Sequence, residues 1–280
     1  MQAEAVHPVP LYDAHNHLQD ERLAPQREAI LAALLRENIR RMVVNGSSEE
    51  DWPAVLELAR CVPQVIPSFG YHPWYVKQRS PNWDRVLIEF LERRPSAIGE
   101  IGLDKWIKDY DLPDQEKVFR RQLEIAAERN LPVSIHCLQA WGKILELLNT
   151  GPRPRCGFVL HSFGGPKEMI EPLARLGAYF SLPGYFANDR KGKQRETFLH
   201  VPLERLLIET DAPDQCLPAE RVKYELSDAK TGKPINHPAN LGAVYEFAAE
   251  LLEKPVVLLA RQVEDNFRRL FAEVTPLHRK

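Results

Sequence analysis

The sequence predicts a single-domain (β/α)8 TIM barrel of the metal-dependent hydrolase type. Short β-branched segments alternate with longer amphipathic segments along the whole chain. Eight such units fit within 280 residues, and no change in composition marks a linker. A doubly wound open sheet is the competing architecture, but eight regular units in this length favour the barrel. We therefore expect one domain, residues 1–280.

The expected strands are short and mostly apolar throughout, as in the segments MVV, FVL and LLI. Strands of a parallel sheet are buried on both faces, so continuous apolar runs are their usual pattern. The expected strands span residues 10–15, 41–45, 65–70, 96–101, 132–137, 156–161, 178–182 and 205–210.

The segments between these strands have helical periodicity. In residues 26–38, Ile30, Ala33 and Leu34 fall on one stripe. The same spacing recurs in residues 114–129, 238–252 and 255–271, which we also expect to be helices. The polar stretch of residues 212–237 follows the eighth strand. We expect it to be an elaborated loop at the active face of the barrel.

Composition and charge limit the function. The net charge of −2 gives no overall basic field, although a local basic patch would suffice for a nuclease that binds its polymer transiently. No window approaches the ~20 consecutive apolar residues that a membrane helix needs. The first ten residues lack the basic segment followed by an apolar segment that is typical of a signal peptide. We expect a cytoplasmic protein without membrane partners, present as a monomer or small homo-oligomer.

Five of the eight expected strands end in residues that commonly bind metals. Catalytic side chains of barrels lie at these carboxyl ends of the strands. Four of the nine histidines of the chain are in this set, whereas scattered histidines would not gather at one end. A single histidine at a strand end is more often structural, but six potential ligands on one face favour a metal site. The set comprises His15, His17, Glu100, His136, His161 and Asp211.

The chemistry of this set suits two divalent ions, with Mg²⁺, Mn²⁺ and Zn²⁺ as candidates. Alternation along a strand puts Asp13, His15 and His17 on one face. Four histidines and two carboxylates exceed what one catalytic ion normally takes, whereas they fit two ions about 3.5–4 Å apart. Glu100 is the natural bridge, because a carboxylate has two oxygens to share.

Such a centre makes water a nucleophile near neutral pH. We expect Asp211 to accept the proton of the attacking water while it also binds metal, so that Asp211 and Glu100 are the catalytic carboxylates. Asp13 and Asp104 are expected to accept hydrogen bonds that orient the ligand histidines.

Four further residues are weaker candidates for substrate binding. His72 lies at the end of the third strand and is a candidate phosphate contact; a polar loop residue before Pro73 is an equally good interpretation. Arg190 and Lys191 follow the seventh strand and are candidates for binding a phosphate backbone, with a solvated helix face as the alternative. His237, in the loop after the eighth strand, is a candidate for the substrate loop.

Several motifs resemble the TatD family of metal-dependent deoxyribonucleases from residue 11 to residue 271. They are YDAHNHL, GYHP, GEIGLD, QEKVFRRQLEIAAERNLPVSIH, HSF, ETDAP, NHPANL and NFRRLF, in the order of the family. The resemblance implies a barrel of the amidohydrolase type with a binuclear site. His15, His17, Glu100 and Asp211 would bind one ion, and Glu100, His136 and His161 the other. It also implies hydrolysis of DNA phosphodiesters, often from the 3′ end.

Two stretches depart from the family. Ser-Arg-Asp-Ala commonly follows the histidine of the fifth strand, but residues 137–140 read Cys-Leu-Gln-Ala, so an arginine is missing. After ETDAP, residues 214–216 read Asp-Gln-Cys rather than beginning with an aromatic residue. Besides a nuclease acting on single-stranded DNA or 3′ ends, a hydrolase of small esters, lactones or amides and a non-catalytic metal-binding protein therefore remain alternatives.

Overall fold

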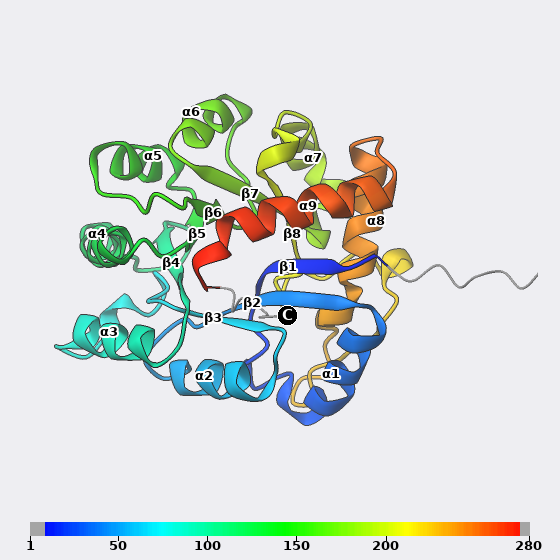
Figure 1. The fold of residues 1–280 in the computed structure, drawn as a ribbon, viewed down its shortest axis with the longest axis horizontal. Coiled ribbons are helices and arrows are strands. Elements are labelled where there is room, and N and C mark those ends of the chain that lie inside the picture. The colour runs from blue at the N-terminus through cyan, green and yellow to red at the C-terminus, as the bar shows by residue number, and fades with distance from the viewer. Residues whose placement is uncertain (1–8, 275–280) are drawn as a thin grey trace, which may run out of the picture.

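The computed structural model describes residues 9–274 and contains an eight-stranded parallel sheet in the order β1 to β8 (Figure 1). The prediction of a (β/α)8 barrel is confirmed. The strands lie within about three residues of the expected segments. They are β1 (Leu11–Asn16), β2 (Ile39–Asn45), β3 (Val65–Phe69), β4 (Ala97–Asp104), β5 (Val133–Leu138), β6 (Phe158–Leu160), β7 (Ala178–Pro183) and β8 (Leu206–Glu209).

The barrel closes where the end of β8 meets β1. The backbone N–H of Asp211 donates to the carbonyl of His15 at 3.0 Å, and the N–H of His17 donates to the carbonyl of Ala212 at 2.8 Å. Asp13 strengthens this seam, because its side chain accepts hydrogen bonds from both the N–H and the hydroxyl of Thr210. The closure brings residues near position 15 beside residues near position 211.

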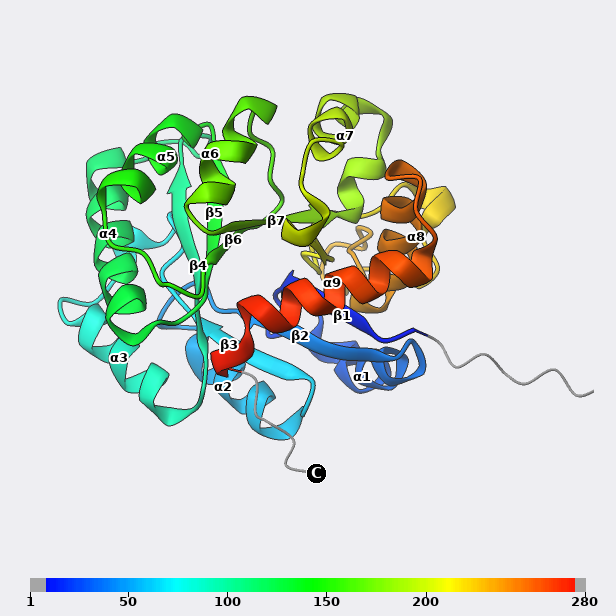
Figure 2. The ribbon, with the colours of Figure 1, turned by 45° about the horizontal axis from the view of Figure 1, so that its top comes forward.

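Helices surround the strands (Figure 2). Each of the first seven helices lies between two strands and returns the chain from the carboxyl end of one to the start of the next, as the crossover connections of parallel strands require. The expected helix 238–252 starts as a short 3-10 turn, Pro238–Asn240. The helices are α1 (Arg27–Arg36), α2 (Trp52–Cys61), α3 (Trp83–Arg93), α4 (Leu112–Arg129), α5 (Trp141–Thr150), α6 (Ile170–Arg175), α7 (Gly192–Phe198), α8 (Leu241–Leu251) and α9 (Val256–Leu270).

Helix α9 lies across the end of the barrel where the strands begin (Figure 1). Phe267 packs against Tyr12 near the start of β1, with ring centroids 5.1 Å apart. The buried amide of Asn266 donates to the carbonyls of Leu203 and Leu206 at 2.7 and 2.8 Å. This end is therefore covered, and the carboxyl ends of the strands form the other, functional end. Among residues 9–274, no helix is both long and apolar enough to cross a membrane.

Candidate metal centre

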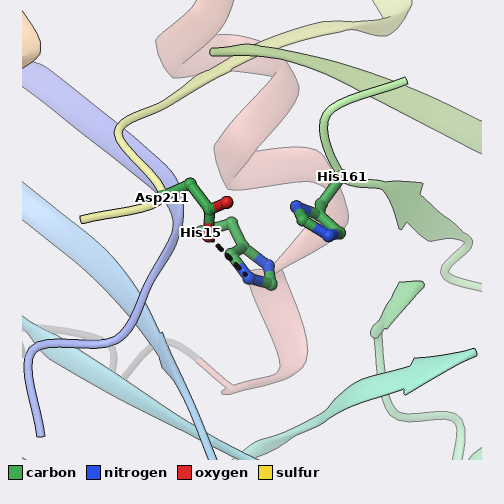
Figure 3. Close-up of side chains that lie close together, drawn as sticks. All are labelled: His15, His161 and Asp211. Atoms are coloured by element: carbon green, nitrogen blue, oxygen red, sulfur yellow. Dashed lines mark ion pairs between the residues drawn. The ribbon is translucent and has the colours of Figure 1, made fainter. Parts of the chain in front are cut away.

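The six residues expected to bind metal converge at the carboxyl ends of the strands. Figure 3 shows His15, His161 and Asp211, from three different strands or strand ends, pointing toward one another. The rings of His15 and His161 stack with centroids 4.1 Å apart. Among the described residues, three groups have ligand atoms close enough to share a cation: His15, His161 and Asp211; His15, His17 and Glu100; and His72, Glu100 and His136.

One side of the cluster is built by the seam between β1 and β8. The Nε2 atoms of His15 and His17 lie 3.3 Å apart. Glu100 Oε2 is 3.3 Å from the first and 3.2 Å from the second. Asp211 Oδ1 is 3.6 and 3.5 Å from the same two nitrogens. Two nitrogens and two carboxylate oxygens therefore face one small space.

The other side is built by β5 and β6. His136 Nδ1 lies 3.0 Å and His161 Nε2 lies 2.9 Å from Glu100 Oε1. The two histidine nitrogens are 3.1 Å apart. The two oxygens of Glu100 thus face two different pairs of histidines. The neighbouring Gly99 makes room for this arrangement, since a Cβ there would lie 2.7 Å from Asn45 Oδ1 and 2.8 Å from the Cβ of Ser134.

The hydrogen-bond partners fix which ring nitrogens carry protons. His17 Nδ1 lies 2.8 Å from the carbonyl oxygen of Asn45, which only accepts, so Nδ1 is the donor. His136 Nε2 lies 2.9 Å from Asp104 Oδ2 and donates to that carboxylate. In their neutral forms both rings then turn a lone pair toward Glu100. A lone pair opposite a carboxylate oxygen needs a cation between them, so these donors fit divalent ions.

The charges of the cluster agree with this fit. Burial raises the pKa of Glu100, but the imidazoles of His161, His72 and His15 outweigh burial and hold that pKa well below its usual range. Burial lowers the pKa values of His17 and His161, but the facing carboxylates outweigh it and hold both well above the usual range. For Asp211, the hydrogen bond with His17 and the nearby histidines overcome burial and lower the pKa to about 2. The centre therefore attracts positive charge, from protons or metal ions.

His72 lies within the cluster, although the sequence marked it only as a weak candidate. Its Nε2 is 3.4 Å from Glu100 Oε1. Its Nδ1 accepts the backbone N–H of Trp74 at 3.2 Å, so the neutral ring carries its proton on Nε2. Burial lowers the pKa of His72 to about 4. Near neutral pH His72 thus turns an N–H donor, rather than a lone pair, toward the centre.

The two aspartates expected to orient histidines make different contacts. Asp104 contacts the His136 ring as expected. Asp13 instead accepts the backbone N–H of His15 at 3.2 Å, besides its bonds to Thr210. The Nδ1 of the His15 ring lies 2.8 Å from the hydroxyl of Ser134 on β5. The orientation of that ring thus depends on a serine that sequence reasoning missed.

Two further residues beside the centre were missed. Glu209, fully buried at the end of β8, accepts hydrogen bonds from Ser162 and Ser181 and lies 3.6 Å from His161 Nδ1. Gln215 donates to Asp211 Oδ2 at 2.6 Å. The alternation of strand side chains offered a signal for Glu209, since it lies two residues before Asp211. For Gln215 the only signal was its departure from the family pattern.

The remaining substrate candidates lie outside the cluster. His237 accepts the N–H of Ala239 through Nδ1 at 3.0 Å and stacks on Tyr224, so it caps the turn before α8. Arg190 and Lys191 follow β7 and lie over the ring of Tyr185, with 5.2 and 4.6 Å between cation and centroid. The structure thus groups Arg190 and Lys191 on one aromatic residue and gives His237 a local structural contact.

The parallel barrel, with histidines and carboxylates gathered at its carboxyl end, defines a metal-dependent hydrolase barrel. A family model described as TatD related DNase matches residues 12–272. The chain belongs to the TatD family. It is 31% identical over 271 residues to the "3'-5' ssDNA/RNA exonuclease TatD" of Salmonella typhimurium, covering 94% of this chain and 100% of that relative. It is 29% identical to the "Uncharacterized metal-dependent hydrolase YjjV" of Escherichia coli K12, covering 92% of this chain and 96% of the relative.

Solved structures agree with the fold. The crystal structure of the TatD homologue YjjV from Escherichia coli matches with a TM-score of 0.84 and 29% identity, covering 94% of this chain and 98% of that one. A TatD family hydrolase from Entamoeba histolytica matches with a TM-score of 0.81 and 17% identity, covering 94% and 98%. The second likeness shows the barrel fold alone.

Proposed function

We propose that this protein is a metal-dependent nuclease that removes nucleotides from the 3′ end of single-stranded nucleic acid at a two-ion centre. The observation that carries the proposal is the position of Glu100, whose Oε2 faces His15 and His17 while Oε1 faces His136 and His161. One carboxylate between two ligand groups is the arrangement that a bridging ligand requires. Relatives named as single-strand exonucleases, aligned over nearly their whole length, support the substrate class.

In this proposal the ligands divide between two ions. His15, His17, Glu100 and Asp211 would bind one, and Glu100, His136 and His161 the other. When bound, such ions supply Lewis acidity, which lowers the pKa of water toward ~7 and neutralises charge that develops on a phosphate. Imidazole nitrogens with carboxylates suit Mn²⁺ or Zn²⁺, and Mg²⁺ is the third candidate.

The protein's own residues supply orientation and proton transfer. Asp211 stays ionised because its pKa is low, and it would accept the proton of the attacking water. His72 would donate from Nε2 to an oxygen of the scissile phosphate, since its partner Trp74 keeps that proton on Nε2. Ser134 and Asp104 hold the rings of His15 and His136 in place.

Arg190 and Lys191 would bind phosphates farther along the strand. Their cationic groups lie over Tyr185, which restricts their rotamers and lowers the entropy that binding must remove. Loss of both cations should weaken binding and reduce its dependence on salt.

The test uses purified protein, stripped of metal and reloaded with Mg²⁺, Mn²⁺ or Zn²⁺. Each form receives 3′-labelled and 5′-labelled single-stranded DNA and RNA, together with p-nitrophenyl esters and phosphodiesters. Progressive loss of nucleotides from the 3′ end, abolished by Glu100→Gln, is the expected result. The matched control is Glu92→Gln, on the exposed surface of α3, which should retain full activity.

Turnover of carboxylic esters without shortening of any nucleic acid would contradict the proposed nuclease activity. It would indicate instead an esterase that acts on small molecules at the same centre. Binding of metal with no turnover at all would indicate a non-catalytic protein. Full activity of Glu100→Gln would contradict the proposed role of the bridging carboxylate.

A further inference from the structure

Aromatic side chains are exposed beside the metal centre, on the loops that follow β3 and β4. Trp74, in the β3–α3 loop, is 44% exposed, and Trp106, in the β4–α4 loop, is 65% exposed. Tyr110 in the same loop is 42% exposed. Side chains of this size usually bury most of their surface, so a group of exposed rings next to a site indicates a binding surface.

One carboxylate connects both tryptophans to the centre. Asp104 Oδ2 accepts the indole N–H of Trp74 at 2.7 Å and also contacts His136 Nε2. Asp104 Oδ1 accepts the backbone N–H groups of Trp106 and Ile107 at 2.6 and 3.2 Å. The aspartate that orients a candidate metal ligand therefore also fixes one indole ring and the loop that carries the other.

Trp74 is in direct contact with the centre. Its ring lies edge-on to His72, with centroids 5.0 Å apart, and 6.4 Å from the ring of His136. A nucleotide whose phosphate reached Glu100 and His72 would have its base near this indole. Trp106 follows Asp104 by two residues, and its side chain is the more exposed of the two indoles.

Cationic residues alternate with these rings. Residues 105–110 read Lys-Trp-Ile-Lys-Asp-Tyr, so Lys105 and Lys108 flank Trp106. Lys77 donates to the carbonyl of Asp109 at 2.7 Å and thereby ties the two loops together. Among the nearby acids, Asp114 forms an ion pair with Arg79 and Asp111 caps α4. Lysines beside exposed rings are the combination that binds single strands, with phosphates on the cations and bases on the rings.

We propose that Trp74 and Trp106 form a stacking platform, on which two bases of the single-stranded substrate lie while its terminal phosphodiester enters the metal centre. This inference rests on the proposed nuclease function and adds where the strand lies. It also gives a physical reason for preferring single strands, because bases that are paired and stacked in a duplex have no free face for the indoles.

The test measures binding separately from hydrolysis. Fluorescein-labelled decathymidylate is titrated with the full-length protein in a chelator, and its affinity is read by anisotropy. Trp106→Ala should bind about tenfold more weakly, the size of effect expected when one stacked base is lost. Trp106→Phe should retain most of the affinity. Leu199→Ala, which removes another exposed apolar side chain (56%) after α7, is the matched control and should bind like the wild type.

Hydrolysis assays with Mn²⁺ complete the test. Trp106→Ala should raise KM for decathymidylate by about the same factor, and raise it less for a dinucleotide. Equal affinities of wild type and Trp106→Ala, with hydrolysis intact, would overturn the platform and leave the nuclease function standing. Trp106-dependent binding without hydrolysis by any metal form would support the platform and contradict the nuclease. If the protein neither binds decathymidylate through Trp106 nor hydrolyses it, both the platform and the nuclease function are overturned. A circular dichroism melt confirms that each variant is folded.

Discussion

At the scale of single residues, the proton on each imidazole decides what that histidine can do. His17 and His136 each donate from one nitrogen to an oxygen acceptor and turn the other nitrogen toward Glu100. His72 does the opposite, because it accepts an N–H from the backbone of Trp74. The same residue type is therefore suited to bind metal at two positions and to donate a hydrogen bond at the third.

His72→Ala tests this distinction. We expect the variant to retain as much metal as the wild type and to lose about 10²-fold or more in kcat/KM, because under the proposed function it lacks only a hydrogen-bond donor to the reacting phosphate. His17→Ala, by contrast, should lose metal. Metal content measured by mass spectrometry beside the nuclease rate checks both expectations. Loss of one ion from His72→Ala would show that His72 is a ligand.

Ser134→Ala removes the hydroxyl that holds the ring of His15. Affinity for metal should fall by about 10–100-fold, the usual effect of losing a partner that orients a ligand. Ser96→Ala is the matched control, because Ser96 is a buried serine whose hydroxyl makes no hydrogen bond within the described residues. Competition with a fluorescent chelator measures the affinities. Equal affinities of the two variants would argue that Ser134 plays no part in orienting the ring.

At the scale of elements, the strands were predictable because each is a short apolar run that the barrel buries on both sides. The six ligand candidates followed from them, since a residue type at the end of a strand is visible in the sequence. Ser134 lies two residues before His136, and Glu209 lies two residues before Asp211, so alternation along each strand puts both on the same face as a ligand candidate. Serine, however, is not a typical metal ligand, and Asp211 was the acidic residue at the very end of its strand. Trp74 was missed because its place beside Asp104 depends on the path of a loop, which periodicity does not describe.

The last helix supplies a prediction about stability. Asn266→Ala would remove the side-chain donor of the Leu203 and Leu206 carbonyls beside the start of β8, although Leu203 keeps the N–H of Leu206. We expect the free energy of unfolding to fall by about 1–3 kcal/mol. Urea denaturation measures the change. Gln262→Ala, which removes the neighbour that donates to Asn266 Oδ1 at 3.0 Å, should cost less because it leaves those carbonyls paired.

At the scale of the whole molecule, one side of the candidate metal centre lies on the seam that closes the barrel. His15 lies in the first strand, His17 directly follows that strand, and Asp211 follows the last strand. An ion bound by all three would therefore connect the two edges of the sheet, in addition to the hydrogen bonds between Asp211 and His15 and between His17 and Ala212. Binding at the seam should stabilise the closed barrel as a unit.

This stabilisation should depend on pH. The pKa values of His17 and His161 are raised above their ordinary value of 6.5. Without metal, the stability that these histidines contribute is fully present below that value and is lost as the pH rises through the raised values. Metal ions replace these protons, so the increase in Tm on adding Mn²⁺ should be larger at about pH 8 than at about pH 6. Thermal melts at both pH values measure it, and equal increases would contradict the ligand assignment.

The same seam has a consequence for the protein during its synthesis. His15 and His17 leave the ribosome early, but Asp211 follows almost two hundred residues later, and the donors of β4, β5 and β6 lie in between. A nascent chain that stops before β8 therefore holds isolated donors but not the assembled centre. The complete set of ligands is therefore absent until residue 211 of the 280 has been made.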